Sequence, residues 1–139
     1  MSIDENKALV RRFVEEFWNM GNMAAADNLM AADATIFLPG QGQVTLDGLK
    51  AFARTLRSAF PDWHATVDEM VGEDDQVAER WTGRGTHRGA FQGIASTGRQ
   101  VVVPGVVFYH IASDKIVVFW GSFDGLALMQ QLGTVRAHS

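Results

Sequence analysis

The sequence contains no cysteine, which excludes disulfide bonds, thiol catalysis and metal sites built from thiolates. Residues 1–7 lack a basic segment followed by an apolar one, so we expect no signal peptide. No apolar run approaches the roughly 20 residues that a membrane-spanning helix needs. The 12 basic residues are scattered and the net charge is −4, which does not indicate a surface for nucleic acid. We expect a cytoplasmic protein with no membrane or nucleic-acid partner.

The length of 139 residues, 47% of them hydrophobic, suffices for one sizeable core. We therefore expect a single domain over residues 1–139. The four histidines show no His-x-x-x-His spacing, so no metal site is expected.

The N-terminal segment has the period of an amphipathic helix. Ser2 and Glu5 have the spacing of a capping box, and apolar residues follow at intervals of three and four as far as Trp18. Gly21 is placed to end this helix, and a shorter helix is expected over residues 23–30.

A strand over residues 35–38 and a loop over residues 39–42 come next. Asp47 is expected to cap a third helix, and Pro61 to end it, because the residue before a proline avoids helical angles.

Beyond Pro61 the apolar period changes from 3.6 to two residues, which is typical of strands. Four strands are expected, over residues 63–72, 76–88, 99–112 and 115–124, and a short helix after them. On the second strand the odd positions, including Val77, Glu79 and Trp81, should face the helices. The polar even positions should face water or a polar subunit interface. This order predicts an α+β fold, a curved antiparallel sheet with helices packed on its concave face.

Several short motifs lie in the second half of the chain: Gly85-Thr-His-Arg-Gly89, Gly93-Ile94, Thr97-Gly98-Arg99 and, after Trp120 and Asp124, Gln131-Leu-Gly133. With these motifs the chain resembles the SnoaL-like polyketide cyclase (ester cyclase) family of the nuclear-transport-factor-2-like superfamily, from about Asn6 to Gly133. The resemblance implies a cone-shaped barrel, usually a homodimer, with a pocket for a small apolar molecule inside the cone. It also implies chemistry without metal or cofactor.

The cyclases of this family close a ring by intramolecular aldol condensation, with an aspartate on the last strand as acid and base. The resemblance places Gly121 at that position, and Val107 where the cyclases have a histidine. Two functions stay open. The chain is a cofactor-independent cyclase or isomerase for a polyketide-like or other apolar substrate, or it is a non-catalytic module that binds or sequesters an apolar metabolite.

Asp124 and His87 are the candidate catalytic residues, as base and proton-transfer partner. For Asp124 the alternative, which we favour, is a cap for the helix that follows it. For His87 the alternative, also favoured, is a hydrogen bond that holds the loop after residue 89.

Other polar residues receive structural interpretations. Glu79 points inward by alternation, but a lone buried carboxylate is costly, so we expect it to be solvated near the hairpin. The single tyrosine, Tyr109, has no feature in the sequence that indicates a tuned environment. His64 and His110 are expected to be ordinary sheet residues.

Aromatic residues exceed what a minimal core requires, and some should line the pocket. Phe119 and Phe123 flank Gly121 and predict a flat apolar slot. Whether the loop over residues 39–42 is a lid is left open. The residues expected to bind the substrate are Phe17, Trp18, Phe37, Phe52, Trp81, Val107, Phe119, Gly121 and Phe123.

Overall fold

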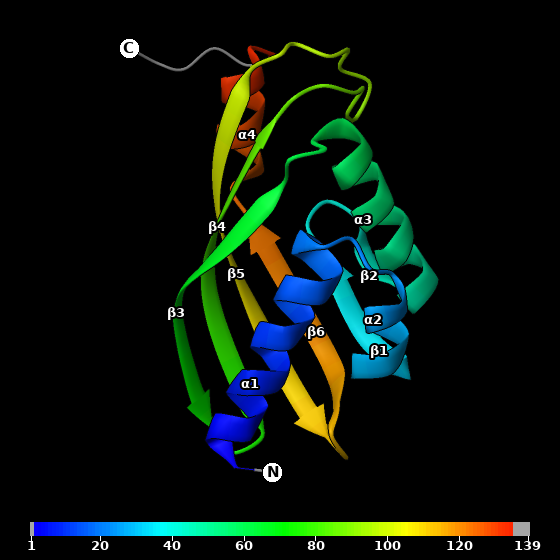
Figure 1. The fold of residues 1–139 in the computed structure, drawn as a ribbon, viewed down its shortest axis with the longest axis vertical. Helices are drawn as coiled ribbons and strands as arrows, with labels where there is room; N and C mark the ends of the chain where they lie inside the picture. The colour runs from blue at the N-terminus through cyan, green and yellow to red at the C-terminus, as the bar shows by residue number, and fades with distance from the viewer. Residues whose placement is uncertain (1, 135–139) are drawn as a thin grey trace.

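The computed structural model describes residues 2–134 (Figure 1). The elements follow one another as α1 (Ile3–Phe13), the π-helix η1 (Val14–Asn19), α2 (Ala24–Leu29), β1 (Met30–Leu38), β2 (Gly42–Val44), α3 (Leu46–Ala59), β3 (His64–Glu73), β4 (Gln76–Thr86), β5 (Gln100–Ala112), β6 (Lys115–Phe123) and α4 (Gly125–Leu132). None of the helices within this range is long and apolar enough to cross a membrane.

Six strands form one curved sheet in the order β2-β1-β6-β5-β4-β3 (Figure 1). The four strands expected after Pro61 are confirmed within two residues at each end. The expected antiparallel pairing is confirmed for β3 to β6 and also holds β2 to β1, whereas β1 and β6 pair in parallel. Strand β2 was not predicted from the sequence. It has three residues and folds back on β1 around the turn after Leu38.

Strand β1 begins at Met30, five residues before the predicted start. Its first half, Met-Ala-Ala-Asp-Ala, has low strand propensity, and the pairing of β1 with β6 is irregular between Met30 and Thr35. Pairing with a neighbour therefore decides the conformation here, and local propensity does not.

The N-terminal helix starts as predicted, with a complete capping box between Ser2 and Glu5. It does not continue as an α-helix to Gly21, because residues 14–19 form a π-helix in which the Met20 amide donates to the Glu15 carbonyl at 2.9 Å. The wider turn changes which side chains after Phe13 face the sheet.

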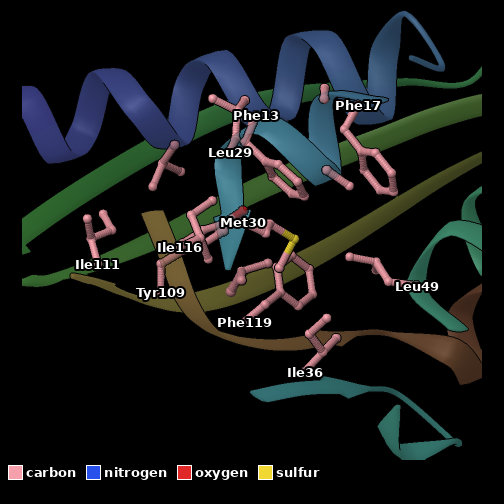
Figure 2. Packing of buried hydrophobic residues seen from close by; sticks show 14 of the residues in the cluster. Phe13, Phe17, Leu29, Met30, Ile36, Leu49, Tyr109, Ile111, Ile116 and Phe119 are labelled. Carbon is pink, nitrogen blue, oxygen red and sulfur yellow. The ribbon is translucent and has the colours of Figure 1, made fainter. Parts of the chain in front are cut away.

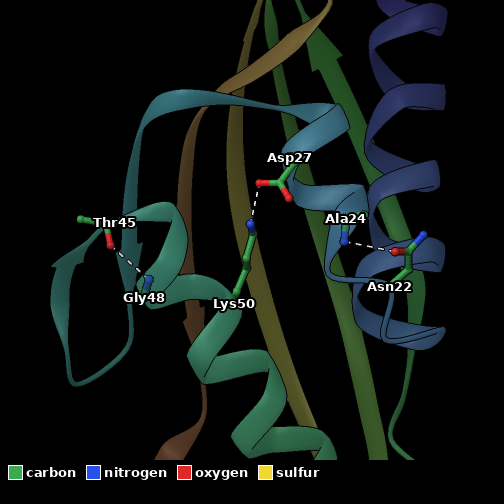
Figure 3. Close-up of polar contacts among 6 residues, drawn as sticks. All are labelled: Asn22, Ala24, Asp27, Thr45, Gly48 and Lys50. Atoms are coloured by element: carbon green, nitrogen blue, oxygen red, sulfur yellow. Dashed lines mark hydrogen bonds and ion pairs between the residues drawn. The ribbon is translucent and has the colours of Figure 1, made fainter.

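Helix α3 is capped by Thr45, whose hydroxyl accepts from the Gly48 amide at 3.1 Å (Figure 3). The prediction of Asp47 as the cap is therefore wrong. Asp47 lies in the first turn, where its charge suits the helix dipole. The helix ends at Ala59, before Pro61, as predicted. Lys50 pairs with Asp27 at 2.5 Å and ties α3 to α2 (Figure 3).

The buried side chains form two clusters on the concave face. The larger lies beneath α1, where Phe13 and Phe17 point toward Met30 and Phe119 (Figure 2). The smaller lies near α4 and the end of α3, and includes Phe60, Trp63, Phe91, Val103 and Leu128. Trp18 and Trp81 pack against both clusters.

The two faces of β4 follow the predicted alternation. Val77, Glu79 and Gly83 are buried beneath the helices, whereas Arg80 and Arg84 are exposed on the outer face. The expectation of a polar outer face does not hold for the neighbouring strands, where Val106, Phe108 and Trp120 are about half exposed.

Candidate functional site

A cavity lies between the two core clusters, under the helices and against the concave face of the sheet. Its free volume, counted as the space open to the centre of a water molecule, is about 70 Å³, which is room for several waters. The lining is almost entirely apolar and comes from most elements of the fold: Trp18, Leu38, Pro39, Phe52, Leu56, Phe60, Trp63, Glu79, Trp81, Phe91, Val103, Val107, Phe119, Gly121, Ser122, Phe123 and Leu128.

Glycines in the sheet make room for the indoles that shape this cavity. A Cβ on Gly83 would lie 2.3 Å from Cζ2 of Trp63, and one on Gly105 would lie 2.2 Å from Cζ2 of Trp81. Both contacts are far shorter than a packed interior permits. Glycine at these two positions therefore leaves room on the concave face of the sheet, and tryptophan fills it.

The floor of the cavity belongs to three cross-strand rows on β4, β5 and β6, which supply Glu79, Trp81, Val107, Phe119, Gly121 and Phe123 to the lining. In the middle row Glu79 pairs with Val107, and Val107 with Gly121. The row toward Trp81 continues through Gly105 to Phe123, and the row on the other side runs from Val77 through Tyr109 to Phe119. Since aligned residues of neighbouring strands share a face, the middle row offers one carboxylate and two apolar positions to the cavity.

Glu79 is the ionisable group of this floor. Its side chain is 3% exposed, and its Oε1 accepts from the Tyr109 hydroxyl at 2.9 Å. Its Oε2 has no hydrogen-bond partner within the described residues. Burial raises the pKa of Glu79 to about 7, and the hydrogen bond from Tyr109 opposes that rise. The expectation of a solvated Glu79 is therefore wrong, because the fold buries this position although it is near the hairpin, and α1 is among the elements that contact β4.

Tyr109 is fully buried, and its pKa lies well above the usual value because of burial and the adjacent charge of Glu79. The structure gives Tyr109 a tuned environment that no feature of the sequence had indicated. One signal for this pair was present in the sequence, since both residues have inward parity on their strands. The register that joins them across the long connection after residue 88 could not be read from it.

Asp124 caps α4, and its Oδ1 accepts from the Ala127 amide at 2.9 Å. The favoured structural interpretation is thus confirmed. The residue is exposed and does not belong to the lining of the cavity. A base at this position would have to leave its cap to reach a ligand there.

His87 is fully buried and lies behind the cavity wall, with its ring 5.4 Å from that of Phe60. The Thr97 amide donates to its Nδ1 at 3.2 Å, and the Thr97 hydroxyl lies 3.0 Å from the same atom. Because Nδ1 accepts, the neutral ring carries its proton on Nε2. The loop-holding interpretation of His87 is confirmed, and the ring is not in the lining.

The backbone of the Gly85–Gly89 motif is also structural. The Arg88 and Gly89 amides donate to the carbonyl of Ala59 at 2.8 and 3.1 Å, so the motif caps the end of α3. A Cβ on Gly89 would lie 2.5 Å from the Ser58 carbonyl oxygen. Glycine is therefore required here.

The second motif of the C-terminal region fastens α4 to the sheet. The Gln131 side chain accepts from the Val102 amide at 2.6 Å and donates to its carbonyl at 2.8 Å. The motifs that carry the family resemblance therefore stabilise the fold around the cavity. None of their residues is among those that line it.

Seven of the nine residues expected to bind a substrate line the cavity: Trp18, Phe52, Trp81, Val107, Phe119, Gly121 and Phe123. The other two do not. Phe17 stacks on Phe13 at 5.0 Å in the larger cluster, and Phe37 pairs with Trp120 at 4.4 Å on the outer face. His64 is exposed and His110 half-buried, and neither lies in the lining.

Comparison with known proteins agrees with the geometry. The chain matches the SnoaL-like polyketide cyclase family over residues 8–132. No curated protein matches it. Among solved structures, AclR from Streptomyces galilaeus, a proposed hydroxylase, is 26% identical, with 99% of this chain and 87% of AclR covered and a TM-score of 0.90.

A proposed polyketide cyclase from Acidithiobacillus ferrooxidans is 31% identical, with 96% of this chain and 98% of that chain covered and a TM-score of 0.83. IdmH from Streptomyces antibioticus, another proposed polyketide cyclase, is 28% identical, with 92% and 98% covered and the same TM-score, 0.83. The fold, the match over residues 8–132 and these likenesses show that the chain belongs to the SnoaL-like polyketide cyclase family.

Proposed function

We propose that the chain takes up a small apolar molecule in the cavity and acts on it as a cofactor-independent enzyme of the cyclase or isomerase type. The observation that carries the proposal is the cavity itself, which lies inside the fold and is lined by aromatic and aliphatic side chains from both core clusters. Such a lining favours planar or aliphatic ligands, because a charged metabolite would lose its hydration without gaining partners.

A polyketide-like substrate fits this chemistry, since its rings are flat and its polar groups are carbonyls and hydroxyls. Polyketide cyclases are also the relatives that the comparisons name. The likeness to AclR shows that similar folds are assigned to more than one reaction, so the reaction must be argued from this chain's own residues.

A non-catalytic binding module is the second candidate, and a specific observation favours it. Val107 and Gly121 leave two positions of the middle row without a polar group. If binding were the whole function, loss of any one titratable residue would leave ligand affinity unchanged.

Uptake of an apolar molecule is tested by titrating 2-tetralone, a flat bicyclic ketone, against tryptophan fluorescence, since Trp18, Trp63 and Trp81 line the cavity. Phe123→Ala should weaken binding about tenfold, because it removes apolar contact worth roughly 1–2 kcal/mol. Leu126→Ala is the matched control, because Leu126 is 59% exposed on α4. Binding that is absent, or equal in both variants, would contradict the proposal.

A homodimer through the outer face of the sheet is part of the proposal. Val71, Val106, Phe108 and Trp120 are each at least 45% exposed on that face, and contiguous apolar surface of this kind is typical of interfaces. Light scattering should give twice the chain mass of 15.3 kDa, and Phe108→Glu should give the mass of one chain. A monomeric wild type would refute the dimer. The expected cytoplasmic location stays a prediction for cell fractionation.

A further inference from the structure

We infer that Glu79, oriented by Tyr109, is the catalytic residue that moves a proton on and off a carbon next to the carbonyl of a bound apolar ketone. The inference rests on the proposed uptake of an apolar molecule and deepens it by naming the acid–base group and the substrate class. Neither residue is Gly121, the position at which the family resemblance places the usual cyclase aspartate.

The first support is the composition of the cavity. Among the described residues that line it, Glu79 is the one whose side chain ionises near neutral pH. The other lining groups are aromatic, aliphatic or glycine, apart from Ser122. Proton transfer to or from a ligand in this space by a side chain of the lining must therefore involve Glu79.

The second support is that the two carboxylate oxygens of Glu79 differ in their hydrogen bonding. Oε1 is held by Tyr109, whereas Oε2 is buried, belongs to a lining residue and has no partner. A carboxylate that served the fold alone would be expected to have both oxygens satisfied, because an unpaired buried oxygen costs stability. A ligand in the cavity is the partner that this geometry leaves open.

The third support is the position of Glu79 within the sheet. Glu79, Val107 and Gly121 form one cross-strand row, so Glu79 is two strands from Gly121, roughly 10 Å at the usual strand spacing. Glu79 and Gly121 therefore lie on the same face of the sheet, on opposite sides of Val107.

The chemical step needs no co-reactant. Ionised Oε2 takes a proton from the carbon beside the ligand carbonyl; the C–H electron pair becomes the C=C bond of an enolate, and the C=O π pair moves to oxygen. Glu79, now a neutral acid, can return a proton to the same carbon, which restores the ketone and, when the carboxyl proton has first exchanged with D₂O, leaves deuterium there. Return of the proton to another carbon of a conjugated system isomerises the ketone. Where the enolate carbon attacks a second carbonyl of the same molecule, the new alkoxide takes the proton and a ring closes.

The environment of Glu79 suits both halves of this cycle. Burial brings its pKa to about 7, so the base and the acid form coexist near neutral pH. Tyr109 is the titratable group that faces it from β5. From the helices the lining residues are apolar, Trp18, Phe52 and Leu56 among them. The charged side chains of Glu69 and Arg80 are more than half exposed and pair with each other on the outer face.

Tyr109 acts as a positioning residue. Its hydroxyl donates to Oε1 and leaves Oε2 for the ligand, and it also stabilises the ionised form. Tyr109→Phe should therefore raise the pH at which exchange is half maximal, a change that a merely structural role would not produce.

The test is exchange of the protons between the carbonyl and the aromatic ring of 2-tetralone for deuterium, followed by proton NMR in D₂O. Wild type should accelerate exchange over buffer, with a rate that rises through a midpoint about pH 7. Glu79→Gln should lose about 100-fold or more of that acceleration and still quench tryptophan fluorescence with nearly the wild-type affinity. Glu69→Gln, the same change on the outer face, should leave the rate unchanged.

The outcomes separate the inference from the proposed function. If wild type binds 2-tetralone without accelerating exchange, or if Glu79→Gln keeps the acceleration, the inference is overturned and uptake of apolar molecules stands. If 2-tetralone does not bind at all, both fail. Should Glu79→Gln not fold, a wild-type rate that is flat between about pH 5 and pH 9, or an unchanged midpoint in Tyr109→Phe, would overturn the inference equally.

Discussion

The buried carboxylate of Glu79 should make the stability of the protein depend on pH in a way that one isosteric substitution removes. Its pKa is 4.5 in the unfolded chain and about 7 in the fold. Between these values the folded state binds more protons than the unfolded state, so this group's contribution to the free energy of unfolding falls as pH rises. Below pH 4.5 both states are protonated, and above about pH 7 the full cost of burying the charge is present.

The magnitude follows from the two pKa values. One unit of pKa corresponds to about 1.4 kcal/mol, so a rise from 4.5 to about 7 corresponds to a cost of about 3 kcal/mol for ionised Glu79. Solvent screening does not reduce this much, because the side chain is only 3% exposed. Tyr109 adds nothing in this window, since its pKa is above its usual value of 10.

The assay is urea denaturation of the wild type and Glu79→Gln at about pH 5 and pH 8. These two pH values bracket most of the range in which the Glu79 contribution to stability changes. Glutamine keeps the shape and can still accept from Tyr109, but it carries no charge. Relative to wild type, the variant should gain about 2.5 kcal/mol of stability between the two pH values, since part of the total change lies outside this window. Titrations of all other groups cancel in the difference. A stability difference that stays constant across this range would refute the burial and the raised pKa of Glu79.

Three further substitutions test the assignments around the cavity. Asp124→Ala should cost about 1 kcal/mol in urea denaturation, the value of an N-cap, while 2-tetralone binding stays unchanged; a large loss of binding would contradict its capping role. Gly105→Ala should destabilise by about 1–3 kcal/mol, because its Cβ would lie 2.2 Å from Trp81, and an unchanged unfolding midpoint would argue against this packing. His87→Ala should remove protection of the Thr97 amide from hydrogen exchange, since that amide donates to Nδ1; protection equal to wild type would show that another group holds the loop.

Much of the fold could be predicted because its long elements have strong periods. The strands after Pro61 alternate clearly, and the turns at Asp74 and at Ser113-Asp114 contain residues that tolerate positive φ, which they adopt. The errors occur where local signals are weak. Strand β2 is short, and Thr45 and Asp47 are both good caps.

The cavity was harder to predict than the fold. Aromatic residues on inward positions, such as Trp81 and Phe123, could be assigned from parity alone. Glu79 and Tyr109 could not be joined, because 30 residues separate them and the connection between β4 and β5 is too long to fix a register. The burial of Glu79 also depends on packing between elements that are distant in the sequence, and α1, from the other end of the chain, is one that contacts β4. A carboxylate four residues after the turn at Asp74-Asp75 is exposed unless a distant element covers it.

The division of the buried side chains into two clusters, bridged by Trp18 and Trp81, has a consequence for how the protein behaves in its cell. A ligand in the gap would complete a core that the chain alone leaves in two parts, so occupancy and resistance to unfolding rise together. At a ligand concentration of 100 times Kd the gain is about 2.7 kcal/mol. The empty protein would then be the form that proteases remove first, and the amount of protein present would follow the supply of its ligand.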